Sequence, residues 1–371
     1  MPSRPWRQDV VRRSTSIVVK IGTSALTDAA GRLDVPFLRD LAGQVARVVN
    51  GGVAVTLVAS GAVGAGMAEL DLPKRPATLP LLQATAAVGQ GQLMRHFSDA
   101  FAAHGMKVAQ ILVTRGDFES RTRYLNIRNT VAALQEFKVV PILNENDSVA
   151  VDELRFGDND IIAAHMTNLL AAGLLVLLTS VDGVYRGKEL LDIIEDAGRG
   201  ALELPTGQRS KLGSGGMGTK LTAAEMVTAA GEVTLVANAR TPNVLGRLLA
   251  GEQLGTLCVP APHKMSARRR WIGQASRATG KLIVDDGAAA ALRERGKSLL
   301  PSGVTAVVGS FEKGDTIAIV DRQGNVIARG LTNYSCDQAS AIKGLKTSQI
   351  AKVLGEKPYD ELVHRNNMTL L

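Results

Sequence analysis

Glycines and a lysine gather in one segment, residues 213–220, which reads Gly-Ser-Gly-Gly-Met-Gly-Thr-Lys. The glycine spacing is that of a phosphate-binding P-loop, but a P-loop ends in Gly-Lys followed by Ser or Thr, whereas this segment ends in Gly-Thr-Lys. Residues without a Cβ let successive backbone N–H groups turn toward an anion, and a lysine adds a full positive charge. The segment therefore indicates phosphate binding outside the usual P-loop fold, with a glycine-rich surface linker as the alternative interpretation.

Two more candidate anion-binding segments follow predicted strands. Lys20 stands near the end of the first strand, where a lysine is costly to bury unpaired, so it either faces solvent or meets an anion. Residues 60–66 read Ser-Gly-Ala-Val-Gly-Ala-Gly and follow the second strand. Their glycines favour close approach to the backbone, and the N-terminus of the helix that follows them favours negative charge. Both segments are therefore suited to an anionic ligand.

Acids and amides are concentrated in two predicted loops, residues 144–149 and 155–160. An isolated Asp or Asn commonly caps a helix or forms a turn, but the six found here are more than capping requires: Asn144, Asn146, Asp147, Asp158, Asn159 and Asp160. Carboxylates beside lysines hold a substrate ammonium group or a magnesium-bound phosphate. Cations for phosphate, acids for positioning and glycines for close approach are together what phosphoryl transfer requires.

The elements that must position these residues alternate along the first part of the chain. The predicted strands are Ile17–Ile21, Val53–Ala59, Val108–Val113, Val139–Leu143, Leu174–Thr179 and Val233–Val236. Amphipathic stretches separate them, among them Phe37–Val49, Leu81–Phe101 and Thr122–Glu136. Apolar strands that alternate with helices predict an α/β fold, a three-layer αβα sandwich around a mostly parallel sheet. Ligands of such sheets bind at the carboxyl ends of the strands, where the candidate residues stand.

A second, smaller domain is predicted after the prolines of residues 260–262. Short strands punctuated by glycines favour a small β-rich barrel there. We predict an N-terminal extension at 1–14, the α/β domain at 15–262, a linker at 263–276 and the β-rich domain at 277–371. From Lys264 onward, 17 Lys and Arg stand against 10 Asp and Glu, a balance of +7 in a chain whose net charge is +8. Such asymmetry favours an anionic partner such as nucleic acid, with a solvated basic surface as the alternative.

Composition narrows the class of protein and its cellular compartment. A chain of 371 residues with 45% hydrophobic and 21% charged residues is typical of a globular protein of two domains. No apolar run is long enough to span a bilayer, and the N-terminus lacks the apolar stretch of a signal peptide. Cys258 and Cys336 have no ligand spacing, which suits a reducing compartment and argues against a zinc site. We therefore predict a cytoplasmic protein with no membrane partner and no metal site built from its own residues.

These residues together resemble the amino-acid kinase family, and within it the kinases that act on glutamate. The resemblance is carried by residues 19–24, 60–62, 144–147, 157–160, 177–179 and 215–220. The pair Asn-Glu-Asn-Asp at 144–147 and Gly-Asp-Asn-Asp at 157–160 narrows it to glutamate. Residues 281–330 resemble a PUA domain, which this branch of the family often carries.

The resemblance implies transfer of the γ-phosphate of ATP, with Mg²⁺, to the side-chain carboxylate of L-glutamate. The product is L-glutamyl 5-phosphate, made in the first step of proline biosynthesis. Lys20 and Lys220 would flank the transferring phosphoryl group, and Asp160 would hold both lysines. The residues implied to bind glutamate are Ser60, Asn144, Asp147, Asp158 and Asn159. Those implied to contact ATP are Lys20, Thr179, Ser180, Ser214, Gly215, Gly216, Met217, Gly218, Thr219 and Lys220.

The family also implies feedback inhibition by proline and self-association, as a dimer or tetramer, through helices of the kinase domain. Three features depart from its pattern: Ser180 stands where relatives often have Asp, Arg155 stands where some have lysine, and the segment 185–211 is shorter than usual. The alternatives are another phosphotransferase of the family, or an RNA-binding or RNA-modifying protein acting through the basic C-terminal domain. A nicotinamide-dependent oxidoreductase is disfavoured because the glycine spacing at 61–66 is not the dinucleotide fingerprint.

Overall fold

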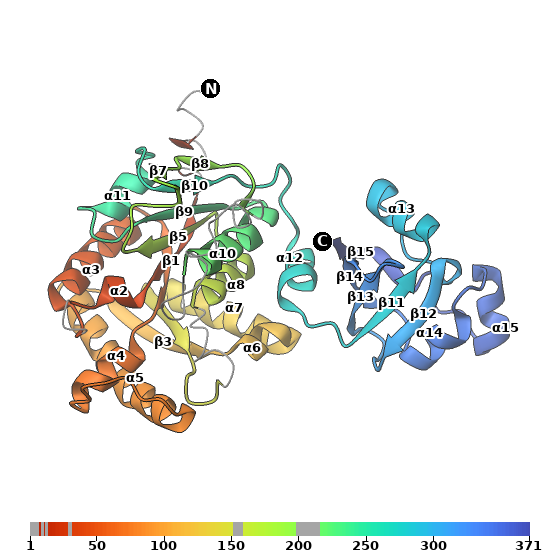
Figure 1. Ribbon diagram of the computed structural model, residues 1–371, viewed down its shortest axis with the longest axis horizontal. Coiled ribbons are helices and arrows are strands. Elements are labelled where there is room, and N and C mark those ends of the chain that lie inside the picture. The colour runs from red at the N-terminus through yellow and green to blue at the C-terminus, as the bar shows by residue number, and fades with distance from the viewer. Residues whose placement is uncertain (1–6, 9–10, 12–13, 29–31, 151–158, 198–215) are drawn as a thin grey trace. The chain divides into compact units, whose positions relative to one another are not determined.

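The computed structural model describes residues 7–8, 11, 14–28, 32–150, 159–197 and 216–371 (Figure 1). The chain forms two compact units, one made of residues 1–117 with 122–264 and the other of residues 118–121 with 265–371. The predicted limits of an N-terminal extension and of a linker at 263–276 stay predictions. None of the helices in the described ranges is long and apolar enough to cross a membrane.

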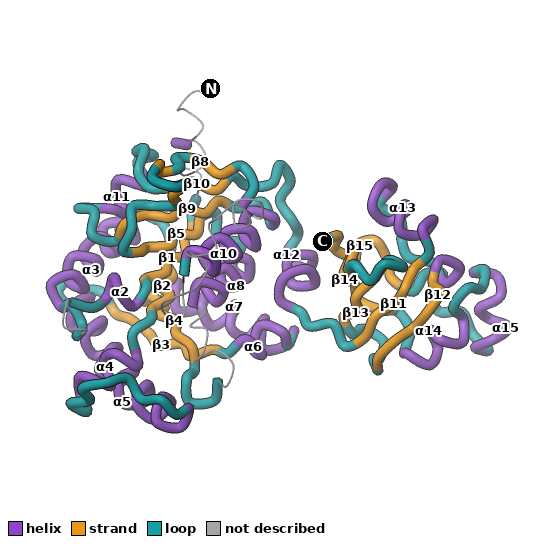
Figure 2. The backbone as a smooth tube through the Cα atoms, viewed as in Figure 1, coloured by secondary structure: helices purple, strands orange, loops and turns teal. Residues whose placement is uncertain are grey.

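The first unit is built on an eight-stranded sheet in the order β3-β4-β2-β1-β5-β9-β10-β8. All the paired neighbours are parallel except β9 and β10, which pair antiparallel. The strands, orange in Figure 2, are β1 (Ser16–Ile21), β2 (Ala54–Ala59), β3 (Lys107–Val113), β4 (Val139–Glu145), β5 (Leu174–Thr179), β8 (Ile193–Ile194), β9 (Val233–Asn238) and β10 (Thr256–Cys258). A separate hairpin joins β6 (Tyr185–Arg186) to β7 (Glu189–Leu190).

Helices cover both faces of this sheet, with α3 and α11 on one face and α8 and α10 on the other (Figure 1). The helices of this part of the chain are α2 (Thr23–Leu26), α3 (Val35–Asn50), α4 (Ala62–Glu69), α5 (Leu79–Ala102), α6 (Arg115–Glu119), α7 (Arg121–Glu136), α8 (Asn159–Leu170), α10 (Met217–Ala229) and α11 (Val244–Leu249). The predicted three-layer α/β fold is confirmed.

Strand β1 shows how the layers follow from the sequence. Ile17, Val19 and Ile21 belong to one apolar core with Leu38 of α3 and Leu93 of α5. Successive side chains of a strand point to opposite faces, so Lys20 lies on the other face, which α8 covers. The alternation that buries three apolar side chains on one side therefore aims the lysine at the opposite layer.

Helices α4 and α5 pack with their backbones in contact. A Cβ on Gly66 of α4 would lie 1.8 Å from the carbonyl oxygen of Thr85, and a Cβ on Gly89 of α5 would lie 1.9 Å from that of Ala62. Neither position therefore tolerates a side chain. Gly61, just before α4, has φ of 107°, a left-handed conformation that favours glycine.

The second unit is β-rich, as predicted. Its five-stranded sheet has the order β12-β11-β13-β14-β15, with β11 and β13 parallel and the other neighbours antiparallel. The strands are β11 (Gly280–Val284), β12 (Val304–Gly309), β13 (Thr316–Val320), β14 (Val326–Thr332) and β15 (Val363–Leu370). The helices are α12 (Ala267–Arg270), α13 (Asp286–Arg295), α14 (Cys336–Ile342) and α15 (Ile350–Leu354). Ile317, Ile319 and Tyr334 lie in its apolar core, which is separate from that of the first unit.

Candidate active site

Two lysines and one aspartate meet at the carboxyl end of β1. Asp160 has no exposed surface, and Lys20 and Lys220 are 3% and 5% exposed. Lys20 Nζ lies 2.6 Å from Asp160 Oδ1, and Lys220 Nζ lies 3.0 Å from Asp160 Oδ2. Each carboxylate oxygen is thus occupied by a different ammonium group. Because two cationic groups share one carboxylate, the cluster is suited to a further anion.

Three elements bring this cluster together. Lys20 comes from β1, Asp160 from the first turn of α8, and Lys220 from the first turns of α10. Thr219 Oγ1 lies 2.9 Å from Asp160 Oδ2 and 2.8 Å from the carbonyl oxygen of Gly216. The hydroxyl therefore ties the start of α10 to α8.

The electrostatics of the cluster favour an ionised Asp160. Burial alone would raise the pKa of this carboxyl, but Lys20 and Lys220 together outweigh it and hold the pKa of Asp160 below its usual value. Removal of either lysine would therefore raise the pKa of Asp160 and weaken the interactions that keep this fully buried carboxylate charged.

A second cluster, made of side-chain amides, lies beside the first. Asn159 Nδ2 is 2.9 Å from Ser60 Oγ, 3.0 Å from Asn144 Oδ1 and 3.2 Å from the carbonyl oxygen of Ala59. Asn144 Nδ2 in turn donates to Gln90 Oε1 at 2.7 Å. Asn144 is the penultimate residue of β4 and Asn159 begins α8, so the predicted glutamate-binding residues Ser60, Asn144 and Asn159 are brought together.

Strand β5 and strand β9 end beside one another at Thr179 and Asn238. Thr179 is 9% exposed, and its carbonyl oxygen accepts from the backbone N–H of Ala239 at 2.8 Å. Ser180 is exposed. Asp182 accepts from Asn238 Nδ2 at 2.9 Å, so the acid that follows Ser180 is held against the end of β9.

The structure does not test every predicted site residue. Asp147 is partly exposed in the loop after β4. Asp158, Arg155, Ser214 and Gly215 lie outside the described residues. Among the described residues no group of three or more His, Cys, Asp and Glu could hold a metal ion. Both oxygens of Asp160 are taken by lysines, so the described residues do not fit a Mg²⁺ site of their own.

One glycine of residues 60–66, Gly66, serves the packing of α4 against α5. Gly66 faces Thr85 across the helix contact described above. The predicted binding of an anion by the rest of this segment stays a prediction. By contrast, a Cβ on Gly22 would lie 3.6 Å from Lys20 Nζ. Gly22 therefore adds no side chain of its own beside this ammonium group.

Two further groups, Gln90 and His165, were not predicted from the sequence as site residues. Gln90 lies on an amphipathic helix, where spacing alone does not show that it reaches Asn144. His165 is buried on α8, and burial, followed by the positive charge of Arg115, lowers its pKa to about 4. This histidine is therefore neutral at neutral pH.

Comparison with known proteins decides the family. A family model described as amino acid kinase family matches residues 15–238. A glutamate 5-kinase from Caldanaerobacter subterraneus subsp. tengcongensis is 43% identical over 362 residues, 96% of this chain and 97% of that protein. The chain belongs to the amino acid kinase family. Other glutamate 5-kinases are equally close, with 44% identity for one from Moorella thermoacetica and 42% for one from Syntrophotalea carbinolica, each over at least 96% of both chains.

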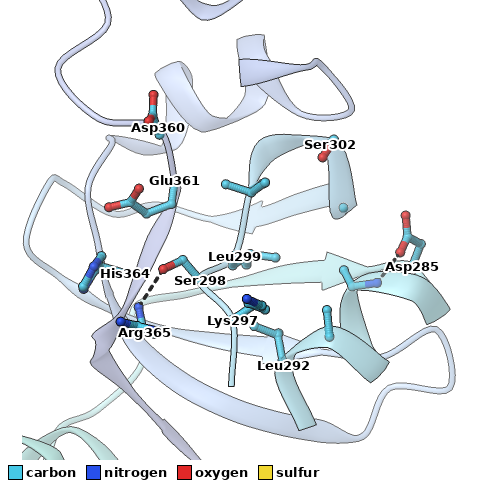
Figure 3. A pocket seen from close by; sticks show the side chains of 14 residues that line it. Asp285, Leu292, Lys297, Ser298, Leu299, Ser302, Asp360, Glu361, His364 and Arg365 are labelled. Carbon is cyan, nitrogen blue, oxygen red and sulfur yellow. Dashed lines mark hydrogen bonds between the residues drawn. The ribbon is translucent and has the colours of Figure 1, made fainter. Parts of the chain in front are cut away.

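The second unit of this amino acid kinase carries a PUA domain, matched over residues 280–354. It holds a cavity of about 660 Å³ between α13, the segment 297–303 and the start of β15 (Figure 3). Lys297, His364 and Arg365 line it together with the acids Asp285, Asp360 and Glu361. The backbone N–H of Arg365 donates to Ser298 Oγ at 3.0 Å and fixes β15 against that segment.

Proposed function

We infer that this chain transfers the γ-phosphate of ATP to the side-chain carboxylate of L-glutamate and forms L-glutamyl 5-phosphate, the first step of proline biosynthesis. The glutamate 5-kinases that match it over nearly its full length support this activity. The observation within the structure that carries it is the pair of lysines held on Asp160 at the carboxyl end of β1.

The reaction brings two anions together, the acceptor carboxylate and the γ-phosphate of ATP. The side-chain carboxylate of glutamate has an unperturbed pKa of about 4.3, so it is ionised at neutral pH and needs no general base. A carboxylate oxygen forms the new bond to phosphorus while the bond from phosphorus to the β,γ-bridging oxygen breaks, and ADP leaves. No proton is transferred in this step. The obstacle is repulsion between the two anions, which Lys20 and Lys220 offset as the charge moves between them.

We propose that Asp160 acts as a positioning residue. Its two oxygens hold the two ammonium groups and so fix the gap through which the phosphoryl group passes. Glutamate is proposed to bind beside this gap, in contact with Ser60, Asn144 and Asn159. Two further acids, Asp147 and Asp158, are proposed to bind it as well. The contact of Asn159 with Ala59 supports this assignment, since it fixes the amide at the end of β2.

The start of α10 is proposed to bind the ATP phosphates, together with Thr179, Ser180 and residues 214–220. Gly216 caps α10 without a side-chain hydrogen bond, which leaves the first N–H groups of this helix for an anion. Mg²⁺ would enter on the phosphates of ATP, where it neutralises charge when bound.

Three further properties are proposed on the family's pattern. Cys258 and Cys336 are free thiols, which suits a cytoplasmic location. Proline would inhibit at or near the glutamate site. Leu70, Leu81 and Val88 are 45%, 57% and 39% exposed on or beside α4 and α5, and such apolar surface supports self-association as a dimer or tetramer.

A second candidate function is RNA contact by the PUA domain. The cations Lys297 and Arg365 on the wall of its cavity, and the excess of basic residues in this unit, support it. Binding of single-stranded and hairpin RNA, titrated against salt, tests it. Loss of affinity as salt rises is expected, and the absence of any binding at low salt would remove the proposal.

The kinase activity is tested by ADP formation with and without L-glutamate. The expected result is glutamate-dependent ADP release, with an acyl phosphate that hydroxylamine traps as a hydroxamate. Aspartate, carbamate, acetylglutamate and UMP, the acceptors of sister kinases, serve as matched controls. Equal or greater stimulation by one of these would assign the chain to another phosphotransferase of the family.

A further inference from the structure

The amides beside the lysine cluster form a directed chain. It runs from Asn159 through Asn144 to Gln90, with donor–acceptor distances of 3.0 Å and 2.7 Å. Each amide side chain has one end that donates and one that accepts, and the two ends differ only in which atom is nitrogen. The direction of the chain must therefore be fixed by groups that can only donate or only accept.

Two backbone groups fix it. The carbonyl oxygen of Ala59 can only accept, and it lies 3.2 Å from the nitrogen of the Asn159 amide. The backbone N–H of Glu145 can only donate, and it donates to Asn144 Oδ1 at 2.9 Å. Asn144 must therefore present Nδ2 to Gln90, and Gln90 must accept through Oε1. The polarity of all three amides follows from the main chain.

This direction leaves both ends of the chain unsatisfied. Gln90 Nε2 and Asn159 Oδ1 are buried and have no hydrogen-bond partner among the described residues. A buried amide that lacks a partner is unfavourable, so such groups in native structures commonly meet a ligand or a water molecule. Gln90 offers a donor and Asn159 offers an acceptor. An anionic group suits the first end and a cationic group suits the second.

The position of Gln90 selects between the two carboxylates of the acceptor. The reacting carboxylate must lie at the lysines, which are held by Asp160, the neighbour of Asn159 in sequence. Gln90 is the far end of the chain, two amides removed from Asn159. Its donor is therefore placed for the carboxylate that does not react.

We propose that Gln90 is a substrate-binding residue whose Nε2 group donates a hydrogen bond to the α-carboxylate of the amino acid acceptor. This assignment rests on the proposed phosphorylation of glutamate. Gln90 then distinguishes an acceptor that carries a second carboxylate from a simple monocarboxylic acid. Because its other end holds Asn144, the same side chain links the α-carboxylate to the rest of the amide chain.

The test compares the full-length protein with its Gln90→Glu variant. The new carboxylate still accepts from Asn144 Nδ2 but offers no donor and repels an α-carboxylate. We expect the KM for glutamate to rise about tenfold to a hundredfold, while the KM for ATP changes less than about twofold. Gln92→Glu, with the same charge change two residues along α5, is the matched control and should leave both values unchanged.

A second substrate separates binding from a structural effect. In the α-amide of glutamate the α-carboxylate is replaced by a carboxamide, whose N–H groups can donate to the carboxylate of the Gln90→Glu variant. The ratio of kcat/KM for glutamate to that for this amide should therefore fall at least tenfold in the variant. Gln90→Met, which keeps the length of the side chain and removes its donor, should raise the KM for glutamate if Gln90→Glu does not fold.

An unchanged KM and an unchanged substrate ratio, in a variant that keeps glutamate-dependent ADP formation, would overturn the proposal. Failure of the wild-type protein to respond to glutamate would instead overturn the proposed function.

Discussion

The clearest test of the lysine cluster is Lys220→Met, which keeps most of the buried aliphatic stem and removes the ammonium group. At the 3.0 Å separation from Asp160, the attraction lost is about 5.5 kcal/mol at an effective dielectric constant of about 20. Repulsion from Lys20 and a desolvation penalty of several kcal/mol offset most of this attraction. Asp160 also keeps Lys20 at 2.6 Å. We therefore expect the unfolding free energy to fall by no more than about 2 kcal/mol.

The effect on turnover should be larger because the ammonium group is proposed to act on charge that develops during transfer. Removing one such donor typically lowers kcat by about 10²- to 10³-fold. The KM for glutamate should change less than about threefold, since that substrate is proposed to bind the amides. Steady-state ADP release with varied glutamate and ATP measures both quantities, and thermal unfolding checks the fold. Lys188→Met, at an exposed position between β6 and β7, is the matched control. Retained kcat with a tenfold higher glutamate KM would refute the assigned role.

Three more outcomes follow from the described contacts. Asp160→Asn should destabilise the protein by about 3–5 kcal/mol, measured by denaturant unfolding, because both buried lysines lose their counter-charge. Gly89→Ala should lower the melting temperature by several degrees, because the new Cβ would lie 1.9 Å from the carbonyl oxygen of Ala62. Gly91→Ala is the control: its Cβ would have no atom within 4 Å, so the melting temperature should be unchanged or higher. Because the pKa of His165 is about 4 in the folded protein and about 6.5 in the unfolded chain, acidification protonates this side chain in the unfolded chain first. The contribution of His165 to the unfolding free energy should therefore be constant above about pH 6.5 and fall by about 1.4 kcal/mol per pH unit down to pH 4. His165→Gln should flatten that slope, and an unchanged slope would contradict this origin.

Much of the fold could be predicted because its strands are apolar on both faces. The sequence predicts strands at Ile17–Ile21 and Leu174–Thr179 correctly, because the strands of a parallel sheet covered by helices are continuous apolar runs. Lys20 could be picked out because it interrupts one of these runs at its end. Strand β15 is hard to predict from sequence because four polar residues, 364–367, follow one another near its centre and hide the alternation that marks a strand.

The limits of prediction in the site have a different cause. Gln90 lies on a helix whose apolar pattern reports only its packing, and its reach toward Asn144 depends on how closely α5 approaches the sheet. Gly66 looked like part of a ligand loop because glycine gives the same signal for a ligand and for a neighbouring helix. Sequence shows that close approach is needed there, and only the three-dimensional arrangement shows what approaches.

The glycine contact between α4 and α5 constrains the distance between two residues proposed to bind the acceptor. Helix α4 begins directly after Ser60 and Gly61, and Gln90 follows Gly89 on α5. The spacing between Ser60 and Gln90 thus depends on main-chain atoms in contact, which have no alternative rotamers with which to absorb a displacement. If Ser60 and Gln90 both bind the acceptor, as proposed, we expect the close packing of the two helices, as well as the side chains themselves, to discriminate against acceptors one methylene shorter or longer.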